Sequence, residues 1–495
     1  MFDTPADAFQ HGNACLARGD AARAVAAFSA CLRLRPGHPA TLFNLANAQF
    51  QAGAPVDSAE TLLRCLRSAP DFAPAYVNLA QVLLRLGLLR QASGIAADAT
   101  RLLPDSVEAW LALGLTRHHA GDYAGAVAAY QAALRILPHH AGALSSLGNT
   151  LRAMGRLQEA LVAHKAAVAA SPEPGPAQAT ARFHRATTLL AIGDYAAGWP
   201  EYEWRWQSAG HAPRFHSRPW RGALLNGQTI LLHAEQGLGD TLQFVRYAPL
   251  VAARGGRVTL ELPPSLLRLL RNLPGVESAV ARGDALPPFD CHCPLLSLPL
   301  AFKTTLDSIP ADIPYLHADT AQAAMWRQCL PRGDGPVVGL VWAGLPNLDD
   351  WQAREIDRRR SLDPTALTGL AGIAGPRFVS LQKDRPPPAI DGLPMFDAMD
   401  EMRDFADTAA LVSALDLVIA VDTAVAHLAA ALGRPVWLLS RYDGCWRWLH
   451  DRSDTPWYPT MRIYRQPRPF AWPEVIARVR QDLQRMVHHW NRAAA

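Results

Sequence analysis

The sequence carries little net charge and has no long uninterrupted apolar segment. Its formal net charge is +4 over 495 residues, which is too weak to indicate a nucleic-acid-binding face. The stretch nearest to a membrane span, residues 415–439, is interrupted by ionisable side chains. These are Asp416, Asp422, His427 and Arg434. The stretch therefore predicts a buried strand, helix and strand rather than a membrane span.

Cysteine is also sparse, and its distribution argues against a disulfide framework. The seven cysteines are scattered through the chain, and an odd, scattered set favours a reducing compartment. The first residues lack a basic segment followed by an apolar one, so we expect a cytoplasmic protein. Cys291 and Cys293 flank His292, but a metal site would need further ligands at suitable spacing. We predict buried thiols there and no metal.

The chain does contain a large apolar fraction and many arginines. Apolar residues make up 49% of the chain and charged residues 19%, so a large core can be buried. Arginine dominates the positive charge, and its guanidinium group suits bidentate contacts with phosphate or carboxylate. This composition fits the binding of an anionic small molecule.

Four sets of residues recur every 34 positions in the first third of the chain. They are the prolines Pro36, Pro70, Pro104, Pro138 and Pro172; the glycines Gly19, Gly53, Gly87, Gly121 and Gly155; and two small-residue sets, Gly12, Ala46, Ala80, Gly114, Gly148 and Cys31, Cys65, Ala99, Ala133, Ala167. Glycine allows a left-handed turn between two helices, and proline ends the second helix. Small residues let helices approach closely. The pattern predicts an α-solenoid and resembles the tetratricopeptide repeat over residues 3–172. One departure is Ser58, where the other repeats carry alanine.

Side-chain amides also follow the period. Asn44 and Asn78 are one repeat apart, as are Asn47 and Gln81, and Asn149 continues the second series. First-helix residues usually face the concave surface of such a superhelix, so these amides could bind the backbone of an extended peptide. The alternative is that they are solvated polar positions. For the array as a whole we expect a protein partner.

A further helical pair is expected after the repeats. Residues 177–207 end in an aromatic-rich segment, which completes a predicted repeat domain over residues 1–207. Residues 208–226 have the proline, glycine and serine content of a linker.

The second half alternates short apolar strands with helices, which predicts parallel sheets. We expect two Rossmann-like lobes, an acceptor lobe over residues 227–330 and a nucleotide-sugar lobe over residues 331–495. Ligands bind between the carboxyl ends of strands in such folds. The terminal helix, from residue 472, is expected to cross back to the first lobe.

Asp240 is the strongest candidate for a catalytic base. It follows a strand and a tight turn in which Gly237 and Gly239 allow a ligand to approach the backbone. A carboxylate there can take a proton from an acceptor hydroxyl. The alternative is a helix cap, since aspartate often accepts hydrogen bonds from free N–H groups at a helix start. Glu235 is the reserve candidate.

Asp422 and Thr423 lie at a strand-to-helix turn that suits anion binding. The helix N-terminus offers N–H groups and a positive dipole end to phosphate, and His427 lies about one turn further on. The alternative assigns Asp422 to a helix cap and His427 to the core.

Other candidates for donor binding carry positive charge or aromatic rings. Arg360 and Lys383 could neutralise a diphosphate, with Arg358 and Arg359 as weaker candidates from the same run. Trp446 and Trp448 could stack on a base or sugar, or pack between the lobes.

At these motifs the second half resembles the heptosyltransferase-like glycosyltransferases, family nine, over residues 228–470. The resemblance implies a two-lobed GT-B fold and an inverting, metal-independent transfer with Asp240 as the base. It also implies that Asp422, Thr423 and His427, which match the family's D-T/S-x-x-x-H turn, bind a nucleotide-sugar donor. No cofactor is expected beyond that substrate. The loop over residues 343–362, where the family has a basic loop, is longer and more acidic than usual in the family and lacks the expected lysine.

The fusion of repeats to such a domain also resembles bacterial enzymes that glycosylate flagellin. The resemblance implies transfer of a sugar to Ser or Thr of a protein held by the repeats. Three alternatives stay open: a non-catalytic adaptor with a degenerate transferase domain, a nucleotide-sugar epimerase, and a lipopolysaccharide or polysaccharide heptosyltransferase.

Overall fold

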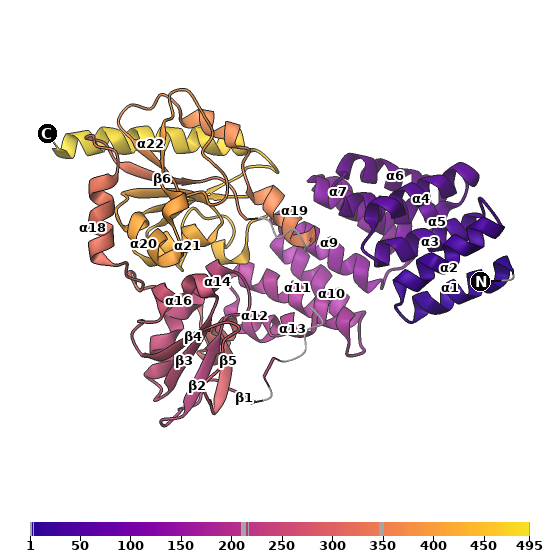
Figure 1. Cartoon of the computed structure of the whole chain (residues 1–495), viewed down its shortest axis with the longest axis horizontal. Helices are drawn as coiled ribbons and strands as arrows, with labels where there is room; N and C mark the ends of the chain where they lie inside the picture. Colours follow the sequence, from indigo (N-terminus) through magenta and orange to yellow (C-terminus); the bar gives the residue numbers. More distant parts are fainter. Residues whose placement is uncertain (1, 3, 209–213, 216, 346–350, 495) are drawn as a thin grey trace. The chain divides into compact units, whose positions relative to one another are not determined.

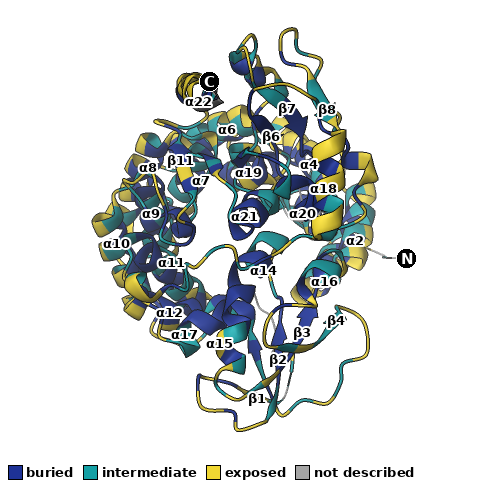
Figure 2. Cartoon of the chain, turned by 90° about the vertical axis from the view of Figure 1, so that its left-hand side faces the viewer, coloured by how far each residue is buried: buried dark blue, intermediate teal, exposed yellow. Residues whose placement is uncertain are grey.

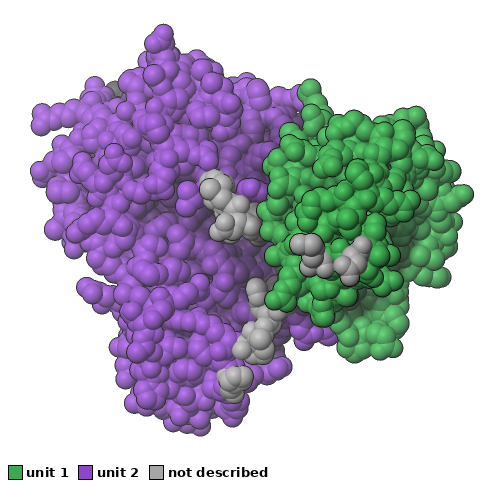
Figure 3. Space-filling view, turned by 45° about the vertical axis from the view of Figure 1, so that its right-hand side comes forward, with its two compact units in different colours: residues 1–184 green, residues 185–495 purple. Residues whose placement is uncertain are grey.

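The chain folds into two compact units, residues 1–184 and 185–495 (Figure 3). The computed structural model describes residues 2, 4–208, 214–215, 217–345 and 351–494. The division between the units falls within α11 (Pro176–Ile192), earlier than the predicted domain boundary at residue 207. None of the described helices has both the length and the apolar composition needed to cross a membrane.

The first unit is the predicted α-solenoid of paired helices (Figure 1). Its helices are α1 (Pro5–Ala17), α2 (Ala21–Leu34), α3 (Pro39–Gln51), α4 (Pro55–Ser68), α5 (Ala73–Arg85), α6 (Leu89–Leu102), α7 (Val107–Ala120), α8 (Tyr123–Ile136), α9 (Ala141–Ala153) and α10 (Leu157–Ala169). Each periodic proline lies two or three residues after the end of the second helix of a pair. This confirms its predicted role.

The periodic glycines between paired helices all adopt the predicted left-handed conformation. The φ angles are 77° at Gly19, 80° at Gly53, 77° at Gly87, 83° at Gly121 and 73° at Gly155. An L side chain is strained at such angles, so these positions favour glycine. The departure at Ser58 has its own partner, because the Ser58 hydroxyl donates to the Ala46 carbonyl at 2.7 Å.

The small residues within the first helices face rings of the second helices. A methyl group on Gly12 would lie 2.6 Å from the Phe28 ring, and one on Gly114 would overlap the Tyr130 ring. At Gly148 the neighbour is the His164 ring, at 2.5 Å. These positions therefore allow the two helices of one repeat to pack closely.

The second unit begins with the end of α11, α12 (Tyr195–Tyr202) and α13 (Arg205–Ser208), followed by a parallel sheet. Its strand order is β1-β5-β2-β3-β4. The strands are β1 (Arg218–Pro219), β2 (Thr229–His233), β3 (Arg257–Leu262), β4 (Val276–Ala281) and β5 (Cys291–Pro294). The inner strands are largely buried, whereas their connecting loops are exposed (Figure 2).

The predicted linker is only partly a linker. Residues 209–213 and 216 lie outside the described residues. Residues 218–219 form the edge strand β1, which pairs with β5, and the Trp220 backbone N–H donates to the His292 carbonyl at 2.8 Å. Trp220 and Leu225 are buried. Proline and glycine here mark a two-residue edge strand and a turn, and the buried Trp220 and Leu225 anchor the segment to the first half of the unit.

A second parallel sheet follows, with the strand order β11-β10-β9-β6-β7-β8. Its strands are β6 (Val337–Val341), β7 (Arg377–Ser380), β8 (Met395–Asp397), β9 (Leu417–Val421), β10 (Val436–Ser440) and β11 (Met461–Arg465). Read from β8, the order within this sheet is 3-2-1-4-5-6, as in doubly wound nucleotide-binding folds. The strand order reverses between β6 and β9, and ligands bind outside the carboxyl ends of strands at such a point.

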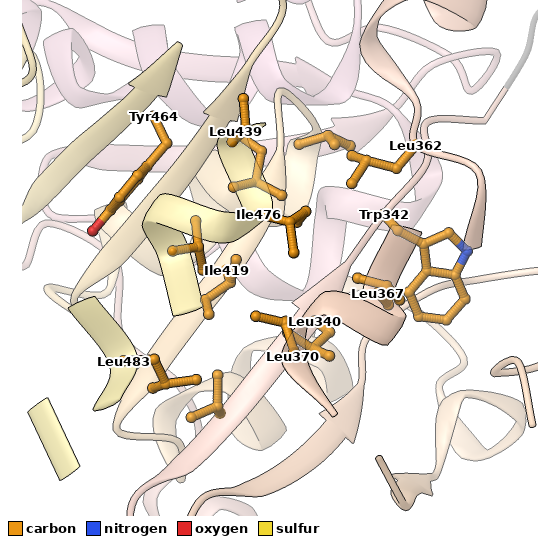
Figure 4. Packing of buried hydrophobic residues seen from close by; sticks show 14 of the residues in the cluster. Leu340, Trp342, Leu362, Leu367, Leu370, Ile419, Leu439, Tyr464, Ile476 and Leu483 are labelled. Atoms are coloured by element: carbon orange, nitrogen blue, oxygen red, sulfur yellow. The ribbon is translucent and has the colours of Figure 1, made fainter. Parts of the chain in front are cut away.

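Two helices occupy positions that differ from the prediction. α18 (Thr320–Cys329) packs against α20 (Phe405–Ser413) of the second half, so the second half begins before residue 331. α22 (Trp472–Ala494) was expected to cross to the first sheet. Its described contacts are instead with the second half, where Ile476 and Leu483 join a core with Leu340 and Ile419 (Figure 4). The apolar stripe of α22 is buried in this core, which holds the helix against the second half.

Candidate functional site

The candidate site is formed where two short helices meet after buried strands. α14 (Leu238–Phe244) follows β2, and α21 (Ala424–Ala431) follows β9; the two pack against each other (Figures 1 and 2). A methyl group on Gly239 would lie 2.8 Å from Cδ2 of His427 and 3.5 Å from Cα of Ala424. Gly239 therefore permits the close approach of these helices. Gly237 is the residue that precedes α14.

Asp240 has both a capping contact and an ionic contact. Its Oδ2 accepts a hydrogen bond from the Gly237 N–H at 2.9 Å, so the side chain caps α14 from within its first turn, whereas the residue at the cap position itself is Gly237. Its Oδ1 accepts from the guanidinium group of Arg447, which comes from the second half of the unit. The side chain is 21% exposed. The carboxylate therefore remains accessible to solvent beside the contact between α14 and α21.

Arg447 is the main site residue that the sequence did not indicate. Its side chain is buried, donates to Oε1 of Gln243 at 2.7 Å, and lies over the Trp446 ring at 4.4 Å. Burial alone would lower the pKa of Arg447, but Asp240, Cys445 and Tyr202 together hold the pKa above its ordinary value. In the sequence, Arg447 stands out only as an arginine between two tryptophans. Its role becomes visible only in the structure, where it pairs with the distant Asp240 carboxylate.

The predicted donor turn is ordered by a tryptophan and an arginine. Oδ2 of Asp422 accepts from Nε1 of Trp448 at 2.9 Å, so this carboxylate does not cap α21. Thr423 precedes α21 without a side-chain capping bond, and its hydroxyl donates to the Val421 carbonyl at 3.1 Å. The N-terminal N–H groups of α21 are therefore not satisfied by a side chain of Thr423 or Asp422.

Arg360 is brought to this turn, as the prediction requires. It ends α19 (Trp351–Arg360), and its Nη1 donates to the Asp422 carbonyl at 3.3 Å. Its Nε donates to Oδ1 of Asp357 at 2.9 Å. Gly344, just after β6, leaves the space that these two side chains occupy, because a methyl group on it would overlap both of them. Residues 346–350 of the loop over residues 343–362 lie outside the described part of the chain.

His427 is a buried, neutral histidine. Its Nδ1 lies 2.9 Å from the Tyr458 hydroxyl, and its ring lies 5.3 Å from the Trp448 ring. Burial lowers the pKa of His427 to about 4, although Asp422 opposes the shift. The core alternative therefore describes this side chain, and it adds no positive charge near pH 7. Its Nε2 is 3.9 Å from Oδ1 of Asp422, so it still borders the turn.

Three other predicted cationic residues have different partners. Nζ of Lys383 donates to the Met399 carbonyl at 3.1 Å and to the Met402 carbonyl at 3.4 Å, away from the Asp422 turn. Arg359 pairs with Asp443, and Arg358 pairs with Glu355. These interactions support the chain around the second sheet.

Glu235 is unsuitable as the reserve base. Its side chain is 5% exposed and forms a buried ion pair with Arg205 at 2.8 Å. It also accepts from the Leu296 N–H at 3.2 Å. Burial raises the pKa of Glu235 even though Arg205 opposes the rise. The residue therefore joins α13 to the first sheet and is not open to an acceptor.

Trp446 and Trp448 are both buried, so the packing alternative describes them. Trp446 lies 5.4 Å from Trp199 and 6.0 Å from Tyr202, both in α12. Trp448 is fully buried against His427 and hydrogen-bonded to Asp422. Neither ring is free to stack on a nucleotide, because core packing already covers it.

The predicted amide series is partly internal to the repeats. Asn44 donates to Asn13 at 2.9 Å, and Asn78 donates to Asn47 at 2.6 Å. These bonds tie the first helices of successive repeats together. Asn149 lies 3.0 Å from Nδ1 of His184, whereas Gln81 is exposed. Peptide binding by these amides stays a prediction.

The two cysteines of the first sheet are buried thiols. Cys291 and Cys293 are at most 1% exposed, and burial raises the pKa of each. Across the described residues, no cluster of three histidine, cysteine or carboxylate side chains could hold a metal ion.

Comparison with known protein families found matches in both halves of the chain. Residues 16–76 and 118–182 match one tetratricopeptide repeat family, and residues 77–141 match another. Residues 402–439, from the start of the α20 region to β10, match glycosyltransferase family 9 (heptosyltransferase). The chain thus combines tetratricopeptide repeats with a heptosyltransferase-like segment that contains the Asp422 turn.

A curated relative and two solved structures show the extent of similarity. Protein FlbA of Caulobacter vibrioides is 31% identical over 349 residues, which cover 64% of this chain and 57% of FlbA. The chain therefore spans less than two thirds of that relative. A thermophilic TPR protein of Thermus thermophilus is 25% identical, with 38% of this chain and 100% of that chain covered and a TM-score of 0.33. MamA from Desulfovibrio magneticus RS-1 is 19% identical, with coverages of 35% and 96% and a TM-score of 0.31.

Proposed function

We propose that the protein is a glycosyltransferase that moves a sugar from a nucleotide-sugar donor to a protein acceptor. The two parallel sheets would act as the two lobes of a GT-B transferase. The observation that supports this most directly is the link between Asp240 and the Asp422 turn. Arg447 pairs with Asp240, and the adjacent Trp448 donates a hydrogen bond to Asp422. A candidate base and a candidate donor turn are therefore neighbours.

The proposed reaction is a direct displacement with inversion. The acceptor hydroxyl oxygen forms a bond to the anomeric carbon as the bond from that carbon to the phosphate oxygen breaks. Asp240 takes the hydroxyl proton. Arg360 and the N-terminal N–H groups of α21 stabilise the negative charge that gathers on the leaving diphosphate. These groups supply the charge stabilisation that the proposal requires.

The acceptor is proposed to be a Ser or Thr hydroxyl of a protein bound by the repeats, with flagellin as a candidate. The repeats support this choice because stacked helical pairs form extended binding surfaces. The match to the heptosyltransferase family favours a second candidate, transfer of heptose to a lipopolysaccharide. Assays with a panel of donors and acceptors distinguish the protein acceptor from the lipopolysaccharide acceptor.

The test compares wild-type protein with Asp240→Asn on a panel of nucleotide sugars and candidate acceptors. We expect transfer by the wild type and a loss of about 10²-fold to 10⁴-fold in the variant, because amide nitrogen and oxygen cannot act as a carboxylate base. Asp319→Asn is the control, since Asp319 caps α18 through Gln322 at 2.8 Å, away from the site. Full sugar transfer by Asp240→Asn would contradict the role of Asp240 as the base, whereas no transfer by the wild type to any acceptor would favour the non-catalytic adaptor for this domain.

A further inference from the structure

We propose that η6 (Trp446–Trp448) is a positioning element that orients Asp240 through Arg447 and is itself seated on α12 through Trp446. The inference rests on the proposed function, because it assigns a role in the same transfer site. It adds Arg447 and Trp446 as positioning residues, although neither needs to touch a substrate.

Three consecutive side chains of η6 contact three different parts of the unit. Trp446 packs against α12, Arg447 pairs with Asp240 of α14, and Trp448 donates to Asp422 after β9. All three are buried. This one turn therefore contacts both the candidate base and the donor turn.

Arg447 holds Asp240 in a defined orientation. A guanidinium group presents donors in a rigid planar fork, and here separate nitrogens contact Oε1 of Gln243 and Oδ1 of Asp240. The second oxygen of Asp240 accepts from the Gly237 N–H. A carboxylate has about four acceptor sites, so two contacts orient it and leave capacity to accept the proton of an acceptor hydroxyl.

The position of η6 depends on aromatic packing with α12. Trp446 lies among Trp199, Tyr202 and Trp457, at centroid distances of 5.4, 6.0 and 6.4 Å. Nε1 of Trp457 donates to the Tyr195 hydroxyl at 3.0 Å, which ties the following segment to the same helix. α12 thus connects the helical segment after the repeats with the turn that orients Asp240.

The residue after η6 shows that the turn is strongly constrained. Leu449 has a φ of 49°, which is uncommon for a leucine. Nη2 of Arg465 donates to the Leu449 carbonyl at 2.8 Å and holds this conformation. Such backbone conformations persist where the surroundings determine them, often at functional sites.

The test measures kcat and donor KM of the full chain for wild type, Arg447→Gln, Arg447→Lys, Trp446→Ala and Trp446→Phe. We expect Arg447→Gln and Trp446→Ala to lower kcat by about 10²-fold, because small misplacements of a reacting group have effects of this size. Donor KM should change by less than about threefold. Trp446→Phe should recover most of the loss, and Arg447→Lys only part, because lysine restores charge but not the fork.

Trp326→Ala is the matched control, since Trp326 is a buried tryptophan of α18 outside the site. Rates are expressed per folded molecule, measured by thermal unfolding. If the site variants lower kcat no more than Trp326→Ala, or change donor KM alone, the positioning role is wrong. If the wild type transfers no sugar to any acceptor, the proposed function fails instead, and the positioning role falls with it.

Discussion

Single glycines control how closely the helices of this protein approach one another. Gly114 faces the Tyr130 ring within its repeat, whereas Gly94 in α6 is exposed and faces open space. The same residue type therefore has opposite consequences at the two positions. In the candidate site, Gly239 resembles Gly114, because it faces the His427 ring at close range.

We predict that Gly114→Ala and Gly94→Ala change stability in opposite directions. Gly114→Ala should lower the free energy of unfolding by about 1–3 kcal/mol, because the methyl group overlaps the Tyr130 ring. Gly94→Ala should raise it by about 0.5–1 kcal/mol, since alanine favours a helix more than glycine does. Urea unfolding of both variants checks this. A stabilised Gly114→Ala protein would contradict the packing.

Glu235 should behave as a structural residue rather than a base. Glu235→Gln should lower the free energy of unfolding by about 3 kcal/mol, because it leaves the buried Arg205 without a main partner. The rate of sugar transfer per folded molecule should stay unchanged. Glu277→Gln, on the exposed side of β4, is the control for loss of a carboxylate. A selective loss of transfer rate in Glu235→Gln would restore the reserve-base hypothesis.

At the scale of elements, buried stripes decide where helices lie. α22 presents Val475, Ile476, Val479 and Leu483 to the core of the second half, and all four are at most 1% exposed. Nη1 of Arg480 donates to the Gly369 and Ala371 carbonyls at 2.8 and 2.7 Å. These contacts hold the helix against the second half rather than the first sheet.

We predict that Leu483→Ala lowers the free energy of unfolding by about 2–5 kcal/mol, because it leaves a cavity in this core. The neighbouring Gln484 is exposed, so Gln484→Ala should stay within about 0.5 kcal/mol of the wild type. Chemical unfolding of the two variants provides the measurement. Equal stabilities would mean that α22 is not part of the core.

At the scale of the whole molecule, histidines whose pKa is lowered in the folded state occur in both compact units. Burial lowers the pKa of His184 to about 4, of His233 to about 3 and of His427 to about 4. An unfolded histidine has a pKa near 6.5. Between about pH 6.5 and the folded values, the unfolded chain therefore binds more protons than the folded chain.

We predict that the protein is most stable above about pH 6.5 and loses stability as the pH falls toward 4. Stability falls with falling pH wherever the unfolded state binds more protons than the folded state. Each of the three histidines should contribute a loss on the order of 2 kcal/mol at pH 5. Unfolding at pH 7.5 and pH 5 measures the effect, and His233→Asn should reduce it. Equal stability at both values would show that these side chains are not buried as neutral groups.

The sequence by itself determined the features that depend on near neighbours in the chain. The 34-residue period predicted the helical pairs, because Gly19 turns the chain and Pro36 ends a helix through their own backbone limits. Alternating strands and helices predicted parallel sheets, and the turns after β2 and β9 located Asp240 and Asp422. The edge strand in the supposed linker was missed because its partner, β5, lies far along the chain.

Only the tertiary structure decided which distant side chains share a site. Arg447 and Asp240 are 207 residues apart, and Trp448 and Asp422 are 26 apart. Nothing in the local pattern of either segment selects the other, because an ion pair or a hydrogen bond depends on packing of whole elements. The same reason explains why His427 is a neutral core residue and why α22 stays on the second half.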